Sequence, residues 1–113
     1  MSQSQIDIDD NDGSWAPAPR WLLHGDYFES SLQKLLWIAL ADQMDSHGFC
    51  QPSLSLLAHD AMCSQSTVLE NLRRLEALGL IMRCSRMTED GKYLPDEYHV
   101  PLERPFYPEE HVR

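Results

Sequence analysis

The segment between residues 64 and 92 holds the side chains of this sequence that best suit contact with nucleic acid. Hydroxyl, amide and carboxylate groups can bond to base edges, and guanidinium and ammonium groups pair with phosphate oxygens. Glutamine suits adenine, glutamate can accept a hydrogen bond from cytosine, and arginines beside a turn suit phosphate. The candidate residues are Ser64, Gln65, Ser66, Thr67, Leu69, Glu70, Arg73, Arg74, Arg83, Arg86 and Lys92.

The same residues also have plainer interpretations, which the sequence alone leaves open. The polar positions could form a solvated helix face, and the Thr67 hydroxyl could cap a helix instead of binding phosphate. Arg73 and Arg74 could pair with Glu70 and Glu76, three or four residues away. Such pairs stabilise a helix by only about 0.2–0.5 kcal/mol.

The charge distribution separates two hypotheses about the partner. The chain has a formal net charge of −9 at pH 7, whereas phosphate contacts need Lys and Arg. Residues 64–87 nevertheless carry four arginines against two glutamates, a net charge of +2. The segment with the nucleic-acid chemistry is therefore the positive one. The alternative is an acidic protein-interaction module that uses Leu69 and its acidic surface, for example as a DNA-mimicking inhibitor of a nucleic-acid-binding complex.

Other kinds of site are poorly supported by the sequence. His47, Cys50, His59 and Cys63 could be metal ligands, but they lack the tight CxxC knuckle of structural zinc sites. Cys63 also falls where an apolar core residue is expected. The sequence contains no glycine-rich phosphate loop and no nucleophile elbow. We therefore expect no metal, no cofactor and no enzymatic activity.

The composition indicates one small domain with flexible ends. Hydrophobic residues make up 42% and charged residues 24% of the 113 residues, which is ordinary for a globular protein. Without a signal peptide or an apolar run of about 18 residues, the chain should be cytoplasmic, with no membrane contact and with reduced cysteines. We expect a disordered acidic tail over 1–14, a domain over 15–102 and an extended C-terminal tail over 103–113, which packs through Phe106 or Tyr107.

Helical spacing of apolar residues and capping signals predict three main helices. The first begins at Ser30 or Ser31 and runs to about Met44, and the others span Ser53–Ala61 and Ser64–Leu78. Gly79 should end the last helix in a left-handed conformation. The second helix should turn Leu54, Leu56, Leu57 and Ala58 inward. The expected core residues are Leu36, Leu57, Val68, Leu72 and Leu75, with Trp21, Trp37, Tyr27 and Phe28 packed around them.

Four short segments read as strands. Leu80–Cys84 and Tyr93–Val100 should form a hairpin around the turn Thr88–Gly91. Phe49–Gln51 and Arg20–Leu23 are the other expected strands. A hairpin that follows a third helix is a wing, so the sequence predicts a mainly α fold with a small β-hairpin wing, a winged helix-turn-helix.

The ordered motifs resemble the helix-turn-helix (winged-helix) domains of phage and plasmid replication proteins and of small bacterial regulators. The resemblance covers residues 19–100. It implies double-stranded DNA as partner, with the third helix in the major groove and the wing beside the backbone, in transcription regulation or DNA replication. The few cations also suggest that useful affinity requires a homodimer. The residues that carry the resemblance are Pro19–Leu23, Ala39–Asp42, Gly48, Pro52–Ser53, Leu57–Ala58, Ser64–Val68, Leu72–Leu75 and Leu78–Ile81.

The sequence departs from the family pattern at several positions. Gln65 and Ser66 stand where members usually carry basic residues, and Leu69 and Glu70 stand where members have polar or basic ones. Each change lowers the positive charge or the number of donors on the expected DNA face. Met62 occupies the turn position that is normally glycine, at a cost of about 1 kcal/mol if the left-handed geometry is kept.

Overall fold

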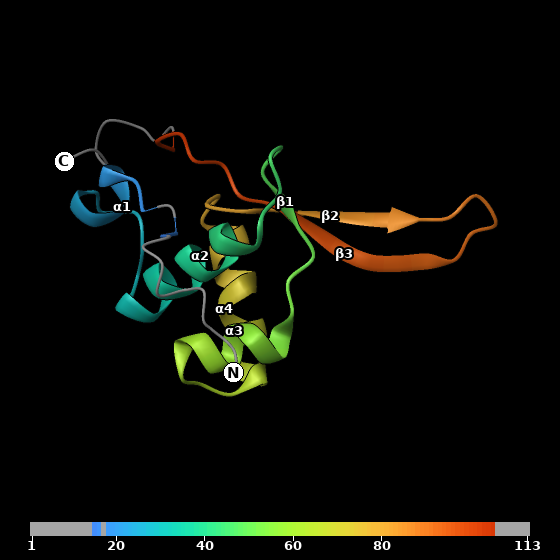
Figure 1. Ribbon diagram of the computed structural model, residues 1–113, viewed down its shortest axis with the longest axis horizontal. Helices are drawn as coiled ribbons and strands as arrows, with labels where there is room; N and C mark the ends of the chain where they lie inside the picture. The colour runs from blue at the N-terminus through green and yellow to red at the C-terminus, as the bar shows by residue number, and fades with distance from the viewer. Residues whose placement is uncertain (1–14, 17, 106–113) are drawn as a thin grey trace.

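The computed structural model describes residues 15, 16 and 18–105, so the expected acidic tail and the expected packing of Phe106 or Tyr107 lie outside the described residues. Within them the fold is mainly helical, with a small antiparallel sheet, and it is the winged helix-turn-helix that the sequence predicts. Figure 1 shows a body of helices from which the β2–β3 hairpin projects. The elements are α1 (Arg20–His24), α2 (Ser31–Gln43), β1 (Phe49–Cys50), α3 (Leu54–Ala61), α4 (Gln65–Ala77), β2 (Met82–Met87) and β3 (Tyr93–His99).

Serine side chains begin the three longer helices, as their positions in the sequence predict. The Oγ atoms of Ser30, Ser53 and Ser64 each accept the amide proton of the residue three positions ahead, at 3.1–3.2 Å. Each bond satisfies an amide that has no partner within the helix. None of the helices in the described part of the chain has the length and apolar character needed to cross a membrane.

The core lies between α2, α3 and α4, and its predicted members are confirmed. Leu36, Leu57, Val68, Leu72 and Leu75 are each no more than 2% exposed. Tyr27 and Trp37 are also buried, and Trp21 and Phe28 pack against the same cluster. The expectation for Leu56 is wrong, because its side chain is 43% exposed. The helical period places Leu54, Leu57, Ala58 and Ala61 on the inner face and turns Leu56 outward.

The expected strand at Arg20–Leu23 is wrong, because this segment forms the short helix α1. No strand pairs with it in the described sheet, so its backbone groups are satisfied locally. The amides of Leu22 and Gly25 donate to the carbonyls of Pro19 and Trp21 at 3.0 and 2.8 Å. Five residues are too few for a helical period to show in the sequence.

The three strands form an antiparallel sheet in the order β1–β3–β2. The second strand begins at Met82, not at Leu80 as expected, and runs on to Met87. Gly79 does end α4 with a positive φ of 78°, and the Leu80 amide donates back to the Leu75 carbonyl at 2.9 Å. This reversal of the chain after Gly79 directs the Leu80 and Ile81 side chains into the core, where both are 1% exposed.

The wing is the hairpin of β2 and β3. Its tip closes through Gly91, at φ 90°, and through the Thr88 amide, which donates to the Lys92 carbonyl at 2.7 Å. The register shifts between Cys84 and Arg86, opposite Pro95 on β3. Proline lacks the amide that a regular ladder needs, and a bulge tolerates it.

The turn between α3 and α4 contains a strained residue. Met62 follows α3 with φ 57° and ψ 48°, in the left-handed region. Its side chain is 91% exposed, so no packing offsets the conformational cost. A turn of this geometry sets the angle between the two helices, which explains why the strain is retained.

Replacing Leu72 by alanine should lower the free energy of unfolding by roughly 2–5 kcal/mol, because it leaves a cavity in the core. Chemical denaturation measures the change. Leu69→Ala is the matched control on the same helix, since Leu69 is 38% exposed, and it should cost less than about 1 kcal/mol. Equal losses in the two variants would contradict the packing of α4.

Met62→Gly should raise the free energy of unfolding by about 1 kcal/mol, because glycine adopts this conformation without strain. Met62→Ala keeps the Cβ atom and should give no such gain. Thermal or urea denaturation of both variants tests the expectation. A gain of the same size from alanine would show that the methionine side chain, not the backbone, is the source of instability.

Candidate nucleic-acid interface

The helix-turn-helix leaves one long face of α4 unpacked. Val68, Leu72 and Leu75 anchor the inner face at 2% exposure or less, and the outer face meets solvent. The exposed residues on this face are Gln65, Ser66, Leu69, Glu70, Arg73 and Arg74. Figure 1 places the α3–α4 end of the body on one side of the base of the hairpin. Leu69 and Arg73 of this face line a groove together with residues of the wing.

Ser64 and Thr67 hold the first turn of α4. The Ser64 Oγ accepts the Thr67 amide at 3.1 Å and donates to the Thr67 hydroxyl at 2.9 Å. Both side chains therefore have a structural role at the helix start. Gln65 and Ser66 follow immediately and are exposed, so they are the polar residues of the first turn that point away from the body.

Two of the candidate arginines make ion pairs with acids from other segments of the fold. The Arg74 Nε donates to the Glu29 Oε1 at 3.0 Å, and the Arg74 Nη2 also donates to the Glu29 Oε2. This contact holds the pKa of Glu29 below its usual range. Arg83 lies between Glu76 of α4, at 3.5 Å, and Asp96 of β3, at 3.3 Å. Arg83 thereby connects the wing to α4.

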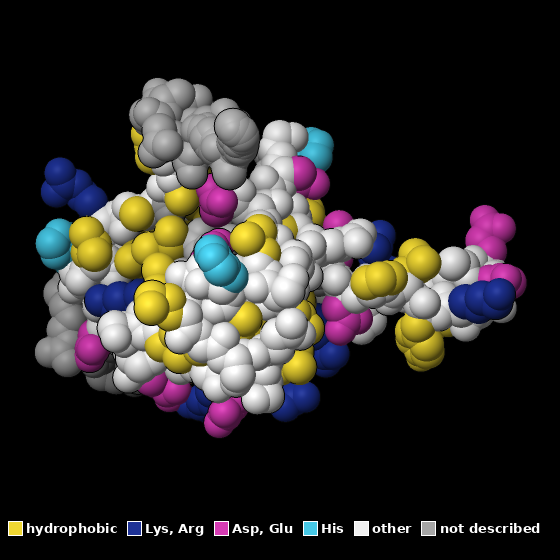
Figure 2. All heavy atoms as spheres, turned by 60° about the horizontal axis from the view of Figure 1, so that its bottom comes forward, with side chains coloured by type: hydrophobic (Ala, Val, Ile, Leu, Met, Phe, Trp, Pro, Cys, Tyr) yellow, Lys and Arg dark blue, Asp and Glu magenta, His cyan; other side chains and the backbone are white. Residues whose placement is uncertain are grey.

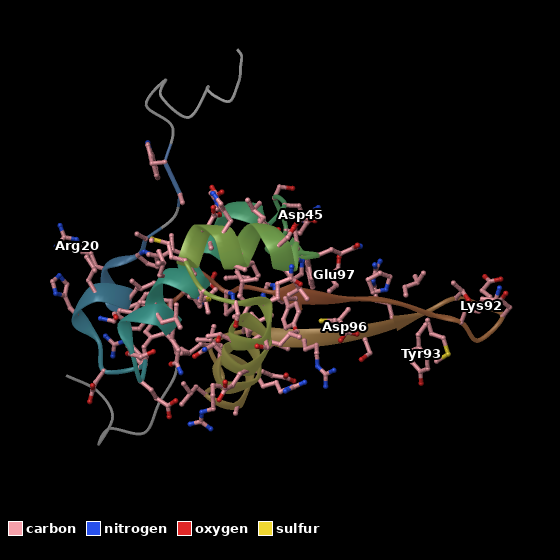
Figure 3. The ribbon with its side chains drawn as sticks, turned by 90° about the horizontal axis from the view of Figure 1, so that it is seen from below. Arg20, Asp45, Lys92, Tyr93, Asp96 and Glu97 are labelled. Atoms are coloured by element: carbon pink, nitrogen blue, oxygen red, sulfur yellow. The ribbon has the colours of Figure 1, made fainter. Side chains whose placement is uncertain are left out.

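The other cations are less constrained. Arg86 donates to the Pro95 carbonyl across the hairpin at 3.3 and 3.4 Å, with no acidic partner among the described residues. Arg73 and Lys92 likewise make no ion pair within the part of the chain that is described. Figure 3 shows Lys92 at the tip of the hairpin, at the opposite end of the molecule from Arg20.

Acidic side chains alternate with the basic ones on this side of the molecule. Figure 2, in which the α3–α4 end comes forward, shows Lys and Arg interspersed with Asp and Glu along the lower rim. The same mixture occurs at the hairpin tip, where Lys92 follows Glu89 and Asp90. The visible face is thus neither continuously positive nor continuously acidic.

A groove separates α4 from the base of the wing. One part, of about 240 Å³, is lined by Leu69, Arg73, Glu76, Arg83, Asp96 and Tyr98. A neighbouring part of about 190 Å³ shares Leu69, Asp96 and Tyr98 and adds Pro52, Leu54, Leu72 and Pro95. Burial raises the pKa of the Tyr98 phenol, so its hydroxyl stays neutral at the mouth of this groove.

Sequence reasoning identified the side chains of α4 and the wing but missed the acids that pair with them. Glu29 is 45 residues from Arg74, and no local pattern could reveal such a pair. Arg73 and Arg74 were expected to pair, if at all, within the helix. In the structure Glu76 instead reaches Arg83, and Arg74 reaches Glu29.

The other cluster considered from the sequence does not converge. Among the described residues no three His, Cys, Asp or Glu side chains are placed to hold a metal ion. Cys50 is buried, and burial raises the pKa of its thiol to about 11. The His59 side chain is 84% exposed beside Asp60, and Cys63 packs against the core.

Comparison with known proteins agrees with this geometry. Residues 30–81, from the cap of α2 to the end of the core segment after α4, match the family described as helix-turn-helix domain. A solved structure described as the N-terminal domain of a DNA-binding protein has a TM-score of 0.58 and 16% identity, with 95% of this chain and 88% of that chain covered. Curated protein sequences give no match. Residues 30–81 are therefore similar to the helix-turn-helix domain family, and the chain has a winged helix-turn-helix fold.

Proposed function

We propose that this protein binds double-stranded DNA, with α4 in the major groove and the hairpin beside the backbone. The observation that carries the proposal is the unpacked face of α4, which presents polar side chains next to a projecting wing. A major groove about 12 Å wide admits a helix presented in this way. The similar solved structure, a domain of a DNA-binding protein, supports the same assignment.

The exposed side chains divide into two groups under this proposal. Gln65, Ser66 and Glu70 face base edges, where an amide can pair with adenine and a carboxylate can accept from cytosine. Arg73, Arg86 and Lys92 carry the charge for phosphate, because no acid neutralises them within the described residues. Phosphate contacts orient the protein, and base contacts select the sequence.

Arg74 and Arg83 contribute in a different way. Each already lies against a carboxylate, so neither releases a full positive charge to the DNA. Arg83 instead fixes the wing relative to α4, which sets the distance between the groove contact and the backbone contact. Arg74 holds the loop before α2 against α4 through Glu29.

The resemblance to phage and plasmid domains suggests a small regulator of transcription or a replication accessory factor of a mobile element. Such a protein acts by binding and needs no catalytic group or cofactor. The three candidate cations without an acidic partner among the described residues give modest affinity per copy, so a homodimer on two half-sites is the form that suits the role. The alternative is an acidic surface that binds another protein. Failure of the protein to bind DNA would favour this alternative.

The salt dependence of DNA binding should separate two neighbouring arginines. Arg73→Ala should reduce the log–log slope of affinity against salt by about 0.9, the value for one phosphate contact. Arg74→Ala is the matched control and should leave the slope nearly unchanged, because Glu29 already neutralises that charge. Fluorescence anisotropy with a random-sequence duplex measures both slopes. An unchanged slope in Arg73→Ala would remove Arg73 from the phosphate contacts.

Glu70→Lys tests the proposal as a whole. It places a cation on the exposed face of α4, so a DNA-binding protein should gain affinity for random duplex DNA and a steeper salt dependence. Electrophoretic mobility shifts at low salt measure the gain, and Glu89→Lys at the hairpin tip serves as a comparison. If the wild type binds no duplex and Glu70→Lys creates no binding, the DNA proposal fails and the protein-interaction alternative replaces it.

A further inference from the structure

Leu69 is an apolar side chain in the middle of the polar face of α4. Its side chain is 38% exposed, whereas Val68 and Leu72 are 0% and 2% exposed. One turn before it lies Gln65 and one turn after it lies Arg73, both exposed. Leu69 therefore lies outside the buried core and lines the groove between α4 and the base of the wing.

We infer that Leu69 contacts the 5-methyl group of a thymine in the major groove. The inference rests on the proposed DNA-binding function and adds to it a base that α4 reads. Among the groups that base pairs present in the major groove, the thymine methyl is the apolar one, and the others are donors and acceptors. The apolar Leu69 among the polar side chains of α4 is thus complementary to an apolar methyl group among polar base edges.

The surroundings of Leu69 favour a methyl group over a polar one. The adjoining hollow of about 190 Å³ is lined mainly by apolar or aromatic side chains, including Leu54, Leu72 and Tyr98. Its charged member, Asp96, is paired with Arg83. Burying a methyl group against Leu69 is favourable because it removes apolar surface from water, whereas the amino group of cytosine would gain no hydrogen bond from the leucine side chain itself.

Gln65 extends the same reading to a second base. It lies one helical turn before Leu69 on the same exposed face of α4, about 6 Å away along the helix axis. The Gln65 amide can bond to both N6 and N7 of adenine. The preferred site therefore contains an adenine near the thymine.

The test compares thymine with uracil, which pairs identically and lacks only the methyl group. Duplexes are first selected by the wild-type protein from a random-sequence pool, then resynthesised with deoxyuridine at each thymine in turn. At one position per half-site, uracil should weaken binding about fourfold, which corresponds to about 0.8 kcal/mol for one buried carbon. Leu69→Ala should bind the thymine and uracil duplexes equally.

Two control variants make the outcome specific. Gln65→Ala should keep the fourfold preference for thymine while losing the preference for adenine. Leu56→Ala removes another exposed leucine, 43% exposed on α3, and should keep both preferences. Equal binding of every uracil duplex by the wild type, or an unchanged preference in Leu69→Ala, overturns this inference and leaves DNA binding intact. Failure to enrich any duplex from the pool overturns the proposed function itself.

Discussion

A buried hydrogen bond joins the two parts of the molecule that the candidate interface requires. The indole Nε1 of Trp37, at 0% exposure in α2, donates to the carbonyl of Leu80 at 3.1 Å. This carbonyl lies just after the glycine that ends α4, where a helix leaves backbone groups without partners. The bond therefore fixes the segment through which α4 passes into the wing. With Leu80 and Ile81 held in the core, β2 leaves the body at a defined place and brings Arg83 between Glu76 and Asp96.

The parts of the fold that depend on local chemistry could be predicted from the sequence. The serine caps, the periodic leucines of α4 and the glycine stop each act over three to five residues, so their signals lie within one short window. The wrong predictions concern segments whose secondary structure depends on tertiary packing. Arg20–Leu23 is helical and pairs with no strand of the described sheet, and β2 starts late because Leu80 and Ile81 are buried in the core.

The candidate site shows the same division. The polar residues of α4 could be identified from the cap and the helical period, but their electrostatic state could not. Whether an arginine is free depends on acids such as Glu29 and Asp96, which the fold brings close from elsewhere. Counting charges over residues 64–87 thus overstates the positive charge available on this surface. The exposed face of α4 and the wing therefore mixes basic and acidic side chains.

The wing has one further property that follows from its place at the edge of the sheet. β2 pairs only with β3 in the described sheet, so its other side is open to a second strand, and open edges invite aggregation. The strand reads Met82-Arg83-Cys84-Ser85-Arg86-Met87, nearly the same in both directions. If two copies aligned these edges antiparallel over their whole length, Arg83 of each would lie opposite Arg86 of the other. Like charges directly opposite each other destabilise a strand pair. Two such edges aligned over their whole length would therefore have to accommodate two pairs of facing guanidinium groups, beside the carboxylates that already hold each Arg83.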